Sequence, residues 1–95
     1  MQGWFKMDFG TGEVIFLDVT QKEDMLQVEY PNCFLLDMGW YQDRYIISIV
    51  HNFDWAHPVR QYETAERDRL PALLTEAVRL VEEESRFVGT KLKEE

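Results

Sequence analysis

The stretch from Cys33 to Asn52 constrains the fold more than any other part of the chain. It holds two apolar runs joined by the polar tetrapeptide Tyr41-Gln42-Asp43-Arg44, a pattern typical of a β-hairpin. If Gln42 and Asp43 are the two turn residues, one face of the hairpin carries four side-chain pairs: Phe34 with His51, Leu36 with Ile49, Met38 with Ile47 and Trp40 with Tyr45. All of these except His51 are large and apolar or aromatic, so we expect this face to lie against the core.

The opposite face of the hairpin mixes polar and apolar side chains. Asp37 and Ser48 lie opposite each other there, while Leu35, Ile46 and Val50 form an apolar patch that another surface should cover. A slip of one residue would bring Asp37 and Ser48 into the core, so the pattern resists a change of register. Gln-Asp is not a preferred two-residue turn, which leaves a longer loop as an alternative.

The segments on either side of the hairpin extend it into an antiparallel β-meander of about five or six strands. Strand candidates are residues 4–9, 13–19, 25–30 and 59–62, and turn signals occur at Gly10-Thr11-Gly12, at residues 20–24 and at Pro31-Asn32. The sequence leaves open whether residues 4–9 and 59–62 join the sheet.

After Tyr62 the spacing of the apolar residues changes to that of an amphipathic helix. We predict a helix over residues 68–88, with Asp68 as its N-cap, Pro71 inside its first turn and Gly89 as its C-cap. Residues 90–95 then form a frayed charged tail. The chain therefore reads as one α+β domain, residues 1–95, in which the meander (residues 4–63) carries the helix on one face.

Composition limits the classes of function that are open to the chain. A net charge of −8 argues against binding to nucleic acid or to an anionic membrane surface, and it favours a basic protein partner. No apolar run approaches the roughly 18–20 residues of a membrane span, and the N-terminus lacks the features of a signal peptide. Because a single cysteine excludes an internal disulfide, we expect a reducing, cytoplasmic location.

Two groups of residues suggest chemistry. The spacing His51-x-x-Asp54-x-x-His57 offers two imidazoles and a carboxylate to Zn²⁺ or Fe²⁺, so a small metal-dependent hydrolase is one alternative. The register, however, places His51 on the core face, and His57 precedes Pro58 in a loop, so we interpret the three as structural. Cys33 and His51 point to opposite faces, which disfavours a thiol–imidazole pair and predicts a packed, inert thiol. We expect no cofactor.

The mixed face of the hairpin is the candidate surface for a partner. Its predicted contact residues are Asp37, Tyr41, Ile46, Ser48 and Val50, with Trp55 beside them. The preferred interpretation is a non-enzymatic cytosolic module that binds another protein, as an inhibitor or immunity protein does. The alternative is a homodimer closed by this face, with a small apolar ligand at its seam.

The run Asp37-Met38-Gly39-Trp40-Tyr41, followed by Asp54-Trp55-x-x-Pro58 and an amphipathic helix, resembles a pattern in small bacterial single-domain proteins. Some immunity proteins of bacterial toxin systems are similar in size, acidity and expected layout. The resemblance covers residues 37–81 and includes no defined functional motif. It implies a bacterial interaction module and assigns no catalytic or binding residue.

Overall fold

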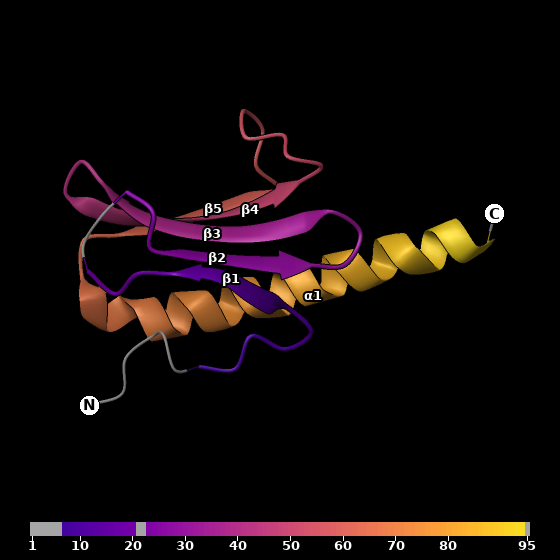
Figure 1. Cartoon of the computed structure of the whole chain (residues 1–95), viewed down its shortest axis with the longest axis horizontal. Coiled ribbons are helices and arrows are strands. Elements are labelled where there is room, and N and C mark those ends of the chain that lie inside the picture. The colour runs from indigo at the N-terminus through magenta and orange to yellow at the C-terminus, as the bar shows by residue number, and fades with distance from the viewer. Residues whose placement is uncertain (1–6, 21–22, 95) are drawn as a thin grey trace.

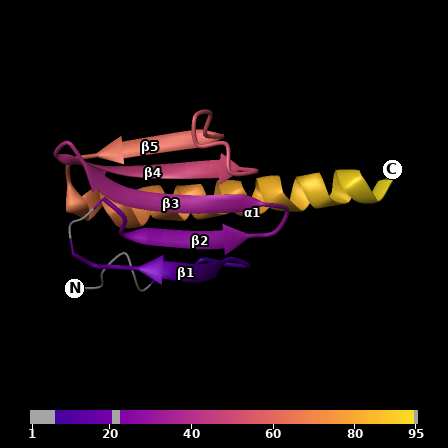
Figure 2. The same ribbon diagram turned by 45° about the horizontal axis from the view of Figure 1, so that its top comes forward.

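The computed structural model describes residues 7–20 and 23–94, with side chains described up to residue 86. Five strands in these residues form one antiparallel sheet in the order β1-β2-β3-β4-β5, and a long helix, α1, lies across one face of it (Figures 1 and 2). This arrangement confirms the predicted α+β meander with a C-terminal helix on one face.

The strands follow one another along the chain with short connections. Their bounds are Glu13–Leu17 for β1, Leu26–Tyr30 for β2, Phe34–Tyr41 for β3, Arg44–His51 for β4 and Arg60–Thr64 for β5. A 3₁₀ turn, Arg67–Arg69, then leads into α1, Leu70–Glu94. The segment predicted at residues 59–62 therefore joins the sheet as β5. Residues 7–9 form no strand, and residues 4–6 of that predicted strand lie outside the described residues.

The central hairpin has the predicted register, from Phe34 opposite His51 to Tyr41 opposite Arg44. Its two turn residues, Gln42 and Asp43, have φ angles of 50° and 69°. Positive φ at both positions is the signature of a type I′ turn, whose twist matches that of the flanking strands. The two-residue turn therefore forms, and the longer loop does not.

The core lies between the sheet and α1. The face of the hairpin that was predicted to be buried supplies Leu36, Met38, Ile47 and Ile49, all fully buried. The helix contributes Leu70, Leu74, Ala77, Val78 and Val81, at the spacing that the sequence indicated. Burial of each large aliphatic side chain contributes about 1.5–3 kcal/mol, so this one interface accounts for most of the stabilisation.

Both ends of α1 differ from the prediction. Asp68 is not its N-cap: it lies within the 3₁₀ turn, which Glu66 precedes without a side-chain cap. Pro71 is the second residue of α1, inside the first turn as expected. Gly89 does not end the helix, and the tail predicted from residue 90 is helical up to Glu94, because glycine permits a C-cap without imposing one. Within the described residues, α1 is not apolar enough to span a membrane.

β1 forms one edge of the sheet and contributes little to the core. Val14 pairs with Val28 and Phe16 with Gln27, and the register shifts between Val14 and Phe16. All five residues of β1 are exposed, including Ile15 and Leu17. The strand was therefore predictable from its β-branched and aromatic composition, whereas its exposure was not.

Candidate functional site

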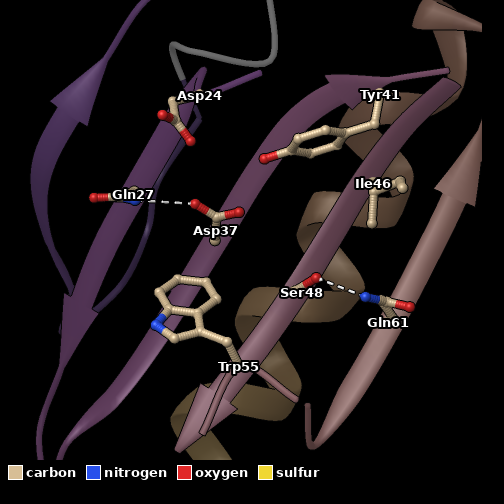
Figure 3. A pocket seen from close by; sticks show the side chains of 8 residues that line it. All are labelled: Asp24, Gln27, Asp37, Tyr41, Ile46, Ser48, Trp55 and Gln61. Atoms are coloured by element: carbon tan, nitrogen blue, oxygen red, sulfur yellow. Dashed lines mark hydrogen bonds between the residues drawn. The ribbon is translucent and has the colours of Figure 1, made fainter. Parts of the chain in front are cut away.

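The face of the sheet opposite α1, here called the open face, is hollowed near its centre. A pocket of about 400 Å³ lies there, and its lining residues come from four strands and two connections (Figure 3). They are Asp24, Gln27, Asp37, Tyr41, Ile46, Ser48, Trp55 and Gln61. We call this the open-face pocket.

The connection before β2 closes one end of the pocket. A Cβ atom added at Gly39 would overlap the carbonyl oxygen of Glu23, so the backbone of Glu23 lies directly against β3 at this point. Only glycine allows so close an approach, and the approach places Asp24 at the rim. The Tyr41 ring also lies against Gly39 and points its hydroxyl group toward Asp24 and Asp37 (Figure 3).

The connection between β4 and β5, residues 52–59, rises over the open face at the other end (Figure 1). It begins with Asn52 and Phe53, both at positive φ. The backbone N–H of Asn52 donates a hydrogen bond to the Cys33 carbonyl oxygen at 2.9 Å. The loop places the Trp55 indole over the sheet next to Asp37 (Figure 3). Because Trp55 remains 51% exposed, it can contact both a bound group and a partner surface.

Asp37 lies at the floor of the pocket and is only 6% exposed. Gln27 Nε2 donates a hydrogen bond to its Oδ1 atom at 3.1 Å, and no cation within the described part of the chain pairs with the carboxylate. Burial raises the pKa of Asp37, an effect that the Gln27 hydrogen bond opposes and the nearby Asp24 charge reinforces. The negative charge of this buried carboxylate is therefore only partly compensated by its neighbours.

The pocket carries a negative potential. Its lining includes two carboxylates and no lysine, arginine or histidine. The pKa of Tyr41 is raised, first by burial and then by the negative charges of Asp37, Asp24 and Glu23. Among the described strand residues of the open face, Arg44 is the one cation, and its Nη1 atom is 2.8 Å from Glu63 Oε1. A positively charged group is the ligand that this field attracts.

The remaining wall is held by a hydrogen bond between two strands. Gln61 Nε2 donates to Ser48 Oγ at 3.1 Å, and both residues belong to the same cross-strand pair of β4 and β5. Ser48 itself is buried, and its partner is an amide, not a base that would activate it as a nucleophile. This side of the pocket therefore supplies polar contacts in a fixed position.

The open-face pocket brings together most of the surface that was predicted from the sequence. Asp37, Tyr41, Ile46, Ser48 and Trp55 all line it. Val50 does not, because it is 1% exposed and packs beneath the surface next to Leu35, which is 7% exposed. The predicted apolar patch is thus largely covered within the chain itself.

Three residues of the lining were not predicted: Asp24, Gln27 and Gln61. Gln27 lies directly opposite Asp37, and the alternation of β2 already placed it on the outer side of the strand. Gln61 lies opposite Ser48, which only the register of β5 could show. Asp24 carries no signal in the sequence, since its position depends on the close approach at Gly39.

The alternative metal site does not assemble. His51 stacks on Phe34, with ring centroids 4.0 Å apart, while His57 Nδ1 lies 3.3 Å from Asp54 Oδ1 in an exposed loop. No group of three potential ligands among histidine, cysteine, aspartate and glutamate is present in the part of the chain that the structure describes.

The prediction of a packed thiol was wrong. Cys33 is exposed in the β2–β3 turn, where it has a φ angle of 63°. The pairing of Phe34 with His51 ends the regular ladder one residue after this turn, so Cys33 has no facing strand residue to cover it.

No protein-family model, curated protein or solved structure matches the chain.

Proposed function

We propose that this chain is a non-enzymatic module that binds a basic protein through the open face of its sheet. The observation that carries the proposal is the Asp37 carboxylate, which is 6% exposed, receives one hydrogen bond from a neutral amide and has no described cation beside it. An ionised carboxylate in such a place costs free energy unless a positive charge compensates it. A lysine or arginine of a partner would supply that charge.

The surroundings of the pocket support a protein partner. The β4–β5 loop exposes Phe53, Trp55 and Val59, of which Trp55 lines the pocket, and such aromatic and aliphatic side chains are typical anchors of interfaces. The net charge of −8 would accelerate association with a basic surface. An inhibitor or immunity protein that acts in the cytoplasm is the specific form that we propose.

The burial of Leu35 and Val50 weakens the case for a homodimer closed by the same face. These residues formed most of the apolar patch that would have filled its seam, and the chain already buries them. Two copies would also bring their acidic pockets toward each other, which like-charge repulsion disfavours. A basic partner meets neither difficulty.

A comparison of three immobilised proteins tests the proposal: the wild type, Asp37→Asn and, as a matched control, Asp43→Asn. The control removes the same charge from an exposed turn residue outside the pocket. Lysate of the source cells is applied at low and moderate salt, bound proteins are identified by mass spectrometry, and the affinity of the purified partner is then measured by calorimetry.

We expect one stoichiometric, basic protein that the wild type and Asp43→Asn retain and that moderate salt weakens. Loss of a partner in a buried, hydrogen-bonded charge pair costs about 2–5 kcal/mol, so Asp37→Asn should weaken affinity by about thirtyfold or more. Equal affinity of Asp37→Asn and wild type would exclude the pocket as the interface. Recovery of this chain alone would favour the homodimer.

A further inference from the structure

We infer that the open-face pocket is the subsite for a single arginine side chain of the partner. The inference deepens the proposed function and rests on it.

The acceptors at the pocket do not converge on one point. Asp37 lies at the floor, on β3, and Asp24 lies at the rim, on the connection before β2 (Figure 3). Gln27 donates to Asp37 Oδ1, and Oδ2 has no donor among the described residues. A ligand that satisfies both acids must therefore donate hydrogen bonds in two directions.

Asp37 differs from a surface acid in its burial. Its side chain is more than nine-tenths buried, it points into the cavity, and no described residue donates a hydrogen bond to Oδ2. Buried polar atoms in folded proteins are almost always satisfied. Asp37 Oδ2 faces a cavity of about 400 Å³, so it can accept a hydrogen bond from a group that enters the cavity.

The walls of the pocket suit a flat cation. The Trp55 indole lies over the sheet beside Asp37, and the Tyr41 ring lies on the other side of the same carboxylate (Figure 3). Cations bind to the faces of such rings, and the planar guanidinium group can also stack on them. Ile46 adds an apolar contact for the methylene stem of the side chain.

These features distinguish arginine from lysine. A guanidinium group presents five N–H donors in a rigid plane, so it can donate to Asp37 in more than one direction while its plane stacks on an aromatic ring. An ammonium group is a compact charge that is strongly hydrated, and it would lose more hydration beside the buried Asp37. The structure therefore assigns the pocket to arginine.

Titration with two model ligands, N-acetyl-arginine methylamide and N-acetyl-lysine methylamide, tests the assignment. The reporter is the indole ¹⁵N–¹H resonance of Trp55, which Trp55→Phe identifies among the three tryptophans. We expect saturable binding of the arginine compound with a dissociation constant on the order of millimolar, as suits a ligand of this size. The lysine compound should bind at least about fivefold more weakly.

The same variants provide the control. Asp37→Asn should weaken binding of the arginine compound by about tenfold or more, and Asp43→Asn should leave it unchanged. Equal binding of the two compounds, no saturable shift, or equal binding to wild type and Asp37→Asn would each overturn the assignment. If Asp37→Asn abolishes capture of the partner but the arginine compound shows no preference, the proposed function stands and the arginine subsite falls. If neither depends on Asp37, both fall.

Discussion

Replacement of Asp37 by asparagine should stabilise the free protein while it removes binding. Asparagine has nearly the same shape, and its Oδ1 atom can accept the 3.1 Å hydrogen bond from Gln27. The substitution removes a charge that is 6% exposed and lacks a described counter-ion. A buried polar group without its partners costs about 1–3 kcal/mol, so we expect the free energy of unfolding to rise by about 1–2 kcal/mol at neutral pH. For a domain of this size, each kcal/mol raises Tm by about 4–8 °C.

The stability gained by Asp37→Asn should depend on pH, and the raised pKa of Asp37 determines whether this gain rises or falls with pH. The folded state holds the proton of this carboxyl more tightly than the unfolded state does. The wild type therefore has its full stability from this group below the unfolded pKa of about 3.9 and loses it as pH rises through the folded pKa. The asparagine side chain of the variant does not titrate. The difference between the variant and the wild type should be smallest at about pH 3 and should reach its maximum near neutral pH.

Urea unfolding followed by circular dichroism between about pH 3 and pH 8 measures this difference, with Asp43→Asn as the control for loss of one charge. The stability of Asp43→Asn relative to the wild type should show no comparable increase with pH, because Asp43 is exposed. If Asp37→Asn were less stable than the wild type at neutral pH, the fold would depend on the charge. The argument that the carboxylate is kept for a ligand would then fail.

Substitutions at three places in the chain test the turns and the close approach of backbone at the pocket. Asn32→Ala should lower the free energy of unfolding by about 1–2 kcal/mol, because it removes a 2.7 Å hydrogen bond to the Ser85 carbonyl oxygen and alanine disfavours a φ of 63°. Asn32→Gly should lower it less, because glycine adopts this φ freely. Equal urea midpoints of the two variants would contradict the argument from φ. Asn and Gly in place of Gln42 and Asp43 should raise stability by about 0.5–1 kcal/mol, whereas a lower Tm would contradict the type I′ turn. Gly39→Ala should lower the free energy of unfolding by about 1–3 kcal/mol, since its Cβ would displace the rim of the pocket. It should also weaken binding of the arginine compound several-fold in the indole titration. Unchanged binding would show that the rim does not contribute to the site.

The sequence predicted the centre of the molecule well because the hairpin carries two independent constraints. Its apolar residues alternate with a period of two, and a shift by one residue would bury Asp37 and Ser48 on the core side. The same alternation placed the candidate surface on the open face, where five of its six residues line one pocket. Local pattern and burial therefore agree throughout β3 and β4.

Features that depend on contacts between distant segments were not predictable. Asp24 and Trp55 belong to the connections before β2 and after β4, and neither connection has a periodic pattern in the sequence. The continuation of α1 past Gly89 and the exposure of Cys33 were missed for a related reason. A glycine such as Gly89 allows a helix either to end or to continue. The burial of Cys33 depends on which other segments of the chain cover its turn.

A comparison with other acids in the chain argues that Asp37 is not a structural residue. Glu82 accepts a 2.6 Å hydrogen bond from the Thr11 amide and holds the N-terminal segment against α1, and Asp18 accepts two hydrogen bonds from Thr20. Asp37 is far more buried than a solvated acid, yet it receives one hydrogen bond and connects no distant segments. The core on the α1 side can support this unfavourable charge, because a cost of about 1–2 kcal/mol is small against a total stability of about 5–15 kcal/mol. We expect Asp37 to lower the stability of the free protein, and it faces a cavity beside two aromatic rings. These features support the proposal that a cation binds there.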